Sequence, residues 1–219
     1  MPTFEGLRLK LLKFRRIVFA NRRQKKLNNT NFTIISNNCW GGMTYETYNL
    51  PKQSPTVGLF FMAEDYIKFI SDLKGYLSED LSFISPKDSK WRNAKEIKND
   101  SHFGQYPIGK LGDIEIFFLH YVSEEQAKEK WERRVERINW DKLLIKFNDQ
   151  NGCNKSDLET FLKLPYKNKI FFTSQKWDGI SSDEIVYIPQ FSKNNFIMAS
   201  YEPFGKNKHF DVNDLLNKL

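Results

Sequence analysis

Residues 113–147, DIEIFFLHYVSEEQAKEKWERRVERINWDKLLIKF, contain the pattern that decides the fold. The first seven of them, residues 113–119, form an almost continuously apolar run that predicts a strand. Ser123 and Gln126 follow with the spacing of a capping box, which marks the start of a helix. Residues 143–147 are again apolar and predict a second strand. A strand, a helix and a strand in this order are typical of parallel strands, because a parallel connection needs a long crossover.

The same alternation of strands and helices extends through the rest of the chain. Apolar runs predict further strands at residues 31–36, 57–62, 81–84, 169–173 and 185–188. Apolar spacing predicts a helix over residues 64–77. Capping residues predict two more helices, one that begins at the Ser156–Glu159 capping box and one that runs from Asp211 to the C-terminus. Strands that are apolar throughout are typical of sheets covered on both faces. We therefore predict the α/β class, with a three-layer α/β/α arrangement, a mainly parallel sheet and a single domain over residues 31–219.

The composition is that of a folded protein. Of the 219 residues, 40% are hydrophobic and 15% aromatic, which supplies a packed core and excludes a disordered chain. No run of about 18 apolar residues is present, so no helix is expected to cross a membrane, and the basic N-terminus does not fit a secretory signal. The two cysteines have no metal-binding spacing and are too few for a disulfide framework, so we expect no metal and a cytoplasmic location.

The net charge of +7 comes from the N-terminal segment. Residues 1–27 hold nine Lys and Arg residues and one acidic residue, which leaves 25 basic and 26 acidic residues in the remainder. Leu7, Leu11, Phe14 and Val18 share one face of a predicted helix in this segment, with basic residues beside them. Such a helix can lie in the headgroup plane of an anionic membrane.

We therefore expect residues 1–30 to form a basic amphipathic leader helix with its linker. Residues 1–27 are expected to bind an anionic membrane surface, which would place the protein peripherally at the inner face of the cell membrane. The alternative is that the apolar stripe packs on the body of the protein or on a second copy. Nucleic acid is not expected as a partner, because no aromatic–basic sheet motif or DNA-reading helix accompanies the basic segment.

The strongest candidate site lies where the predicted strands end. Ligands of open α/β sheets bind beyond the carboxyl ends of the strands, so residues that follow parallel strands meet at one edge. The residues at these positions are rich in Asn, Cys, His and Asp. They are Asn37, Asn38, Cys39, Trp40, Gly41 and Gly42 after the first strand, His120 and Tyr121 after residues 113–119, Asn148 and Asp149 after residues 143–147, and Ser174 and Gln175 after residues 169–173.

Cys39 and His120 are the candidate catalytic residues, a nucleophile–base pair in which a nearby imidazolium would stabilise the thiolate form of Cys39. Asn37 and Asn38 carry amide groups that can hydrogen-bond an oxyanion or sugar hydroxyls. The two glycines that follow would let a backbone N–H group approach a ligand closely. The alternative is structural: Cys39 as a small core residue and His120 as a hydrogen-bonded residue at a strand end.

A basic ridge is predicted on the helix that begins after Ser123. Its members recur three or four residues apart, and they are Lys130, Arg133, Arg134 and Arg137. Guanidinium groups match the geometry of phosphate and carboxylate, so a diphosphate or an anionic headgroup is a suitable ligand. The alternative is a solvated face on which these side chains pair with neighbouring glutamates.

Five sequence strings, in this order, resemble the DUF1919 family. They are ISNNCWGG (35–42), SPTVGLFF (54–61), YPIG (106–109), FFLHY (117–121) and KWERRVERIN (130–139). The resemblance covers about residues 31–175 and leaves the basic leader outside. It implies a bacterial protein of capsule or exopolysaccharide gene clusters with an α/β/α fold. The motif residues that it carries onto this chain are Asn37, Asn38, Cys39, Trp40, Gly41, Gly42, Ser54, Pro55, Thr56, His120, Tyr121, Trp131, Arg133, Arg134 and Arg137.

Together, the residues and the resemblance predict a transferase that acts on a membrane-linked glycan. Acyl transfer to a sugar hydroxyl is preferred, with His120 as the base and the basic ridge as the site for the phosphate of the donor. The donor is expected to be an acyl-CoA or a nucleotide sugar, and the partner a glycan or a lipid-linked sugar. A glycosyltransferase and a non-catalytic carbohydrate-binding or scaffolding protein remain the alternatives, because fold alone does not determine function.

Overall fold

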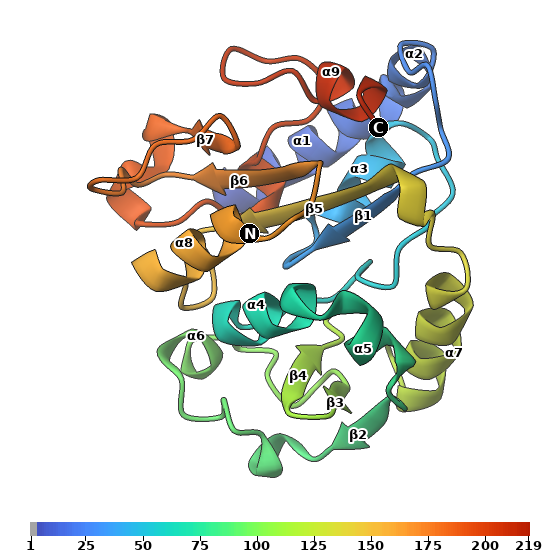
Figure 1. The fold of residues 1–219 in the computed structure, drawn as a ribbon, viewed down its shortest axis with the longest axis vertical. Coiled ribbons are helices and arrows are strands. Elements are labelled where there is room, and N and C mark those ends of the chain that lie inside the picture. The colour runs from blue at the N-terminus through green and yellow to red at the C-terminus, as the bar shows by residue number, and fades with distance from the viewer. Residues whose placement is uncertain (1–3) are drawn as a thin grey trace.

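The computed structural model describes residues 4–219, so residues 1–3 of the predicted leader lie outside the described residues. Its first sheet contains four strands, all parallel, in the order β1-β5-β6-β7 (Figure 1). These strands are β1 (Thr33–Ser36), β5 (Leu143–Asn148), β6 (Lys169–Thr173) and β7 (Ile185–Tyr187). The mixed α/β class and the mainly parallel sheet are therefore confirmed.

A second, antiparallel sheet lies beside the first and was not predicted. It has the order β2-β3-β4, formed by β2 (Ser82–Ile84), β3 (Ile108–Leu111) and β4 (Ile114–Phe117). The prediction that residues 113–119 belong to the parallel sheet is wrong. The reason is the two-residue turn Gly112–Asp113, in which Gly112 has a φ of 52°. This turn joins β3 and β4 as an antiparallel hairpin. The predicted three-layer arrangement did not include this sheet.

The side chains of the parallel sheet alternate between two cores, as the two-residue period of a strand requires. On one face, Ile34 of β1 joins a cluster with side chains of α3 (Trp40–Thr47) and α9 (Val212–Asn217). On the other face, Ile35 joins a cluster with side chains of α4 (Ala63–Ser71) and α8 (Lys155–Lys163). The second cluster also contains Ile114 and Ile116 of β4, so both sheets share one core.

Figure 1 shows the consequence for the layout of the chain. Helices cover both faces of the parallel sheet, and the antiparallel sheet lies beyond α4. Segment 57–62, predicted as a strand, contributes to this second sheet only through an isolated bridge between Phe60 and Phe117. The shorter elements are α6 (Lys95–Lys98), η1 (Pro86–Asp88), η2 (Trp140–Lys142), η3 (Pro189–Asn194) and η4 (Ala199–Tyr201).

The predicted helix starts are correct at two positions and shifted at a third. The Ser123 hydroxyl accepts from the backbone N–H of Gln126 at the start of α7 (Glu124–Val135), and Asp211 caps α9. Helix α8 begins two residues earlier than predicted, because Asn154 and Asp157 form its capping box. The helix predicted over residues 64–77 is divided at Asp72, which caps α5 (Leu73–Ser78).

The leader forms two helices, α1 (Phe4–Val18) and α2 (Ala20–Gln24). Helix α1 packs on the body through a mixed face: Leu9 and Leu12 are partly buried, Arg16 is buried, and the Arg16 guanidinium lies 5.2 Å from the centre of the Phe204 ring. The predicted alternative, in which the apolar stripe packs on the body, is wrong. The stripe faces outward, and its side chains are more than half exposed: Leu7 52%, Leu11 58%, Phe14 64% and Val18 53%.

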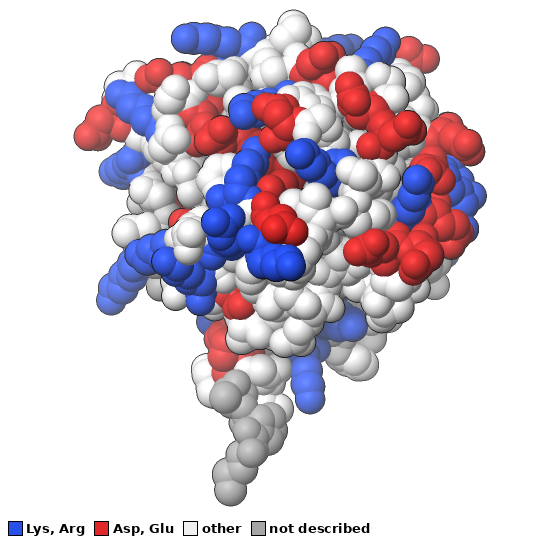
Figure 2. Space-filling view, turned by 90° about the horizontal axis from the view of Figure 1, so that it is seen from below, with Lys and Arg blue, Asp and Glu red and all other residues white. Residues whose placement is uncertain are grey.

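None of the helices within residues 4–219 is long and apolar enough to cross a membrane. Charge is also distributed unevenly over the surface. On the face shown in Figure 2, Lys and Arg side chains gather in the middle and lower left, and many Asp and Glu side chains lie toward the right.

Candidate active site

Cys39 and His120 lie next to each other although 81 residues separate them in the chain. Cys39 follows β1 and is the N-cap residue of α3, whereas His120 follows β4 of the second sheet. The distance between Cys39 Sγ and His120 Nε2 is 3.5 Å. His120 is fixed through its backbone N–H, which donates to the Gly58 carbonyl at 3.0 Å. The pair predicted from the sequence is therefore within hydrogen-bonding reach.

Burial keeps both members of this pair in their neutral forms near pH 7. It raises the pKa of the Cys39 thiol to about 12, against a smaller opposing effect of the charge on Lys146. It also lowers the pKa of His120. A neutral thiol beside a neutral imidazole can pass its proton to that imidazole as the sulfur attacks a substrate. This arrangement differs from the predicted thiolate stabilised by an imidazolium, because burial disfavours the charged forms of both side chains.

A cavity of about 370 Å³ contains both side chains and has a strongly cationic lining; we call it the cationic cavity. One acidic side chain, that of Glu46, lines it, and Lys52 pairs with Glu46 at 2.9 Å. Among the described residues, no other cation of the lining forms an ion pair with an acidic side chain. The five cations are Lys13, Arg16, Lys52, Lys130 and Arg134. This excess of positive charge suits a phosphate-bearing ligand.

Helix α7 supplies two of these cations and thereby divides the predicted basic ridge. Arg134 is buried and donates from Nη1 to the Tyr121 hydroxyl at 2.6 Å, while that hydroxyl donates to the Val57 carbonyl. Lys130 lies with its Nζ 5.5 Å from the centre of the Tyr121 ring. The two remaining members point elsewhere: Arg133 pairs with Glu129 at 2.9 Å, and Arg137 is exposed beyond the end of the helix.

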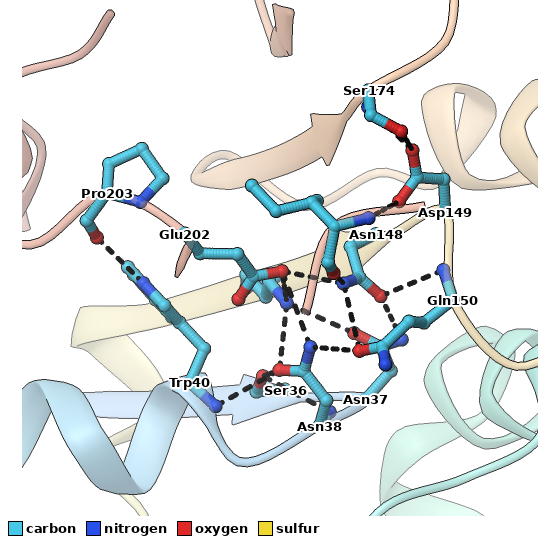
Figure 3. Close-up of polar contacts among 12 residues, drawn as sticks. Ser36, Asn37, Asn38, Trp40, Asn148, Asp149, Gln150, Ser174, Glu202 and Pro203 are labelled. Carbon is cyan, nitrogen blue, oxygen red and sulfur yellow. Dashed lines mark hydrogen bonds and ion pairs between the residues drawn. The ribbon is translucent and has the colours of Figure 1, made fainter. Parts of the chain in front are cut away.

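Asn37, Asn38 and Asn148 belong to a buried polar network, which Figure 3 shows. At its centre, the Glu202 Oε1 atom accepts from Lys146 Nζ at 2.6 Å, Asn148 Nδ2 at 2.6 Å and Asn38 Nδ2 at 3.3 Å. Lys146 also donates to the side-chain oxygen of Asn38 at 2.9 Å. The amide groups predicted to contact a ligand are therefore engaged within the protein, where they hold the turn that leads to Cys39.

The charges of this network are fully enclosed. Burial lowers the pKa of Lys146 and raises the pKa of Glu202, and the contact between the two side chains opposes both shifts. The Oε2 atom of Glu202 is buried and has no hydrogen-bond partner in the described part of the chain. Sequence reasoning missed both residues. The position of Lys146 inside the otherwise apolar strand LLIKF indicated an unusual residue, whereas nothing in the sequence around Glu202 indicated a role for Glu202.

Trp40, Gly41 and Gly42 belong to α3 rather than to a loop. Trp40 is fully buried and donates from its indole N–H to the Pro203 carbonyl at 2.8 Å. A Cβ atom at Gly41 would lie 3.2 Å from the Ser36 Cβ, so this glycine lets the helix pack closely against β1. Gly42 lines the cationic cavity, where its backbone faces Val57.

Asp149 lies away from the Cys39–His120 pair. Its carboxylate accepts from the backbone N–H groups of Ser174 at 2.6 Å and Ile197 at 2.8 Å, and from the Thr173 hydroxyl at 3.0 Å. Asp149 and Gln175 line a separate cavity at the end of β6. The carboxylate thus ties the ends of two strands and the C-terminal segment together.

Comparison with known proteins identifies the family. The family model described as a domain of unknown function, DUF1919, matches residues 11–217. The chain belongs to the DUF1919 family. An uncharacterized protein of Haemophilus influenzae is 32% identical to this DUF1919 protein over 216 residues, which are 98% of this chain and 96% of that protein.

The family match corrects one prediction. The resemblance seen in the sequence left the whole leader outside the family, but the matched region begins at residue 11 and includes the second half of α1. Lys13 and Arg16 therefore lie inside the family region, as do the other cations of the cationic cavity. The part of the leader from residue 11 onward therefore belongs to the DUF1919 region and contributes to its candidate site.

Proposed function

We propose that this DUF1919 protein is a transferase in bacterial capsule or exopolysaccharide synthesis, which moves an acyl group to a hydroxyl of a membrane-linked glycan. The observation that supports this proposal best is the 3.5 Å contact between Cys39 and His120 inside a cavity lined by five cations. The thiol is the nucleophile for the acyl group, and the cations bind the phosphate groups of the donor.

The reaction proceeds in two halves. Cys39 Sγ attacks the acyl carbonyl of a phosphate-bearing thioester such as an acyl-CoA, and the thiol proton moves to His120 Nε2. The bond between the carbonyl and the donor sulfur breaks, and the departing thiolate takes that proton. A sugar hydroxyl then attacks the acyl-Cys39 thioester and gives its proton to His120, which returns the proton to the Cys39 sulfur. His120 thus serves as base and acid in both halves.

The protein is proposed to work at the inner face of the cell membrane, bound through α1. The helix presents an exposed apolar stripe, and its basic residues Lys10 and Arg15 are exposed at the edges of that stripe. Apolar side chains can enter the headgroup region while flanking cations contact anionic lipid. On its other side, α1 contributes Lys13 and Arg16 to the cationic cavity. The same helix would therefore hold the active site at the surface that carries the glycan.

Substitutions at the pair test whether the protein is a catalyst or a binder. Cys39→Ser and His120→Ala should abolish transfer from an acyl-CoA, while both variants still show a thermal shift with that donor. A donor at about 100 times its dissociation constant adds roughly 2.7 kcal/mol to the free energy of unfolding. Cys153→Ser is the matched control, because Cys153 is the second free cysteine and lines a different cavity. Full activity of Cys39→Ser would eliminate the covalent route.

Two lysines on α7 test the donor site. Lys130 lines the cationic cavity, whereas Lys128, two residues earlier, pairs with Glu132 on the outer surface. Lys130→Ala should weaken binding of an acyl-CoA about tenfold, since a hydrogen bond to a charged group contributes about 1.5 kcal/mol. Lys128→Ala should leave the affinity unchanged. Equal effects of the two substitutions would contradict the proposed donor site. A thermal shift with nucleotide sugars but not with acyl-CoAs would favour glycosyl transfer instead.

A further inference from the structure

A second cavity, of about 430 Å³, also reaches the Cys39–His120 pair. It shares Cys39, Met43 and His120 with the cationic cavity, so these three side chains form a common wall. Asn38, Phe60 and Leu119 lie near the pair, and the remaining lining comes from the α6 region, the end of β5 and the segment around η4. Cys39 and His120 therefore line both cavities.

The two cavities differ in charge. Glu96 and Asp100 line the second cavity, and among its described lining residues there is no Lys or Arg. Phosphate groups are repelled by such a lining, whereas a neutral ligand is not. We call this second site the polar cavity.

The hydrogen-bonding groups of the polar cavity match hydroxyl groups. Gln150 Oε1 accepts from Asn38 Nδ2 at 3.1 Å, and Asn151 Nδ2 donates to the Phe61 carbonyl at 2.8 Å. The donor side of Gln150 and the acceptor side of Asn151 thus remain for a ligand, together with the exposed carboxylate of Glu96. A hydroxyl both donates and accepts, so a ligand with several hydroxyls can use all of these groups. The Phe60 ring adds an apolar surface to the same cavity.

From these observations we infer that the polar cavity is the acceptor site, which binds a neutral saccharide and presents one of its hydroxyls to the acyl group on Cys39. This inference rests on the proposed function, since it needs an acyl-Cys39 intermediate. Donor and acceptor occupy two different cavities that share Cys39, so the departing donor need not leave through the site where the acceptor binds. The reaction is consequently a two-step exchange with separate binding sites.

The test follows the discharge of acetyl-Cys39 by mass spectrometry. The full-length protein is acetylated with acetyl-CoA, freed of donor, and mixed with neutral methyl glycosides of glucose, galactose and N-acetylglucosamine or with glucose 6-phosphate. At least one neutral glycoside should accelerate discharge tenfold or more over water, and the sugar phosphate should not. Ser200→Trp, which places an indole in the polar cavity, should abolish that acceleration while acetylation by acetyl-CoA proceeds at the original rate. Lys95→Trp, whose side chain lines a different cavity, is the control and should behave as the unmodified protein.

The outcomes separate the two proposals. Absence of acetyl-Cys39 in the unmodified protein overturns the proposed function and this inference with it. Formation of acetyl-Cys39 without acceleration by any neutral glycoside, or with acceleration that persists in Ser200→Trp, overturns the acceptor site alone. His102→Trp, on an exposed turn that lines the same cavity, provides a second blocking variant if Ser200→Trp does not fold.

Discussion

The exposed stripe of α1 gives the sharpest prediction about membrane binding. Leu11 and Phe14 are 58% and 64% exposed, and they face away from the body of the protein. Full burial of a Leu or Phe side chain contributes about 1.5–3 kcal/mol. Scaled by these exposed fractions, transfer of both side chains into lipid is worth about 2–4 kcal/mol. Replacing both with serine should therefore weaken binding to vesicles by roughly 30-fold to several hundredfold.

The assay is sedimentation with vesicles that contain anionic phosphatidylglycerol. Leu11→Ser/Phe14→Ser should remain in the supernatant, and its thermal unfolding should match that of the original protein because neither side chain is buried. Phe196→Ser, at another exposed aromatic position, should bind as before. Lys10→Ser/Arg15→Ser should lose about 1 kcal/mol of binding free energy per removed charge on anionic vesicles, and none on neutral vesicles.

Unchanged sedimentation of the Leu11→Ser/Phe14→Ser variant would refute the membrane role of this stripe. Point substitutions are needed here because deletion of residues 1–27 would have further effects. It would also remove Lys13 and Arg16 from the cationic cavity and Ala20 from the core. Loss of activity in such a truncation would therefore say nothing about lipid binding.

Three further predictions concern the site and the core. Burial lowers the pKa of His120, so the imidazole stays neutral to a pH below its ordinary pKa of about 6.5. The transfer rate should therefore be constant from pH 7 to 9 and fall only at lower pH, and a decline that begins above pH 7 would contradict this. Lys146→Met leaves the buried charge of Glu202 without its partner and should lower the free energy of unfolding in urea by about 3–5 kcal/mol. The double variant Lys146→Met/Glu202→Leu should recover most of that loss, and equal losses in the two variants would contradict this explanation. Gly109→Ala should cost about 1–3 kcal/mol in the same assay, since the new Cβ would lie 2.6 Å from the Phe118 ring; an unchanged midpoint would show that the ring can move.

The parallel sheet could be predicted because each of its central strands is a nearly continuous apolar run in the sequence. Residues 143–147 and 169–173 carry apolar side chains on both faces, with Lys146 as a buried exception, and helices cover both faces in the structure. The antiparallel sheet was missed because β4 is equally apolar, so periodicity cannot separate it from a parallel strand. The turn Gly112–Asp113 was the available signal, since a Gly-Asp pair between two apolar runs is typical of a hairpin.

The candidate site was predictable in its centre and not in its surroundings. Cys39 and His120 were selected because each follows a predicted strand, although these strands belong to different sheets. The contribution of Lys13 and Arg16 could not be predicted, because it depends on which face of α1 packs on the body. An apolar stripe ordinarily packs inward, and here it faces outward. Glu202 enters the network through tertiary contacts alone, so no local pattern could indicate it.

The central claim is that Cys39 carries the transferred group, and peptide mass spectrometry tests it most directly. The protein is mixed with acetyl-CoA in the absence of any acceptor, quenched in acid within seconds, and digested. We predict one acetyl group on Cys39 and none on Cys153, which lines a different cavity. Acetylation should be much slower in His120→Ala, which lacks the base. An unmodified Cys39, or equal acetylation of both cysteines, would contradict the account.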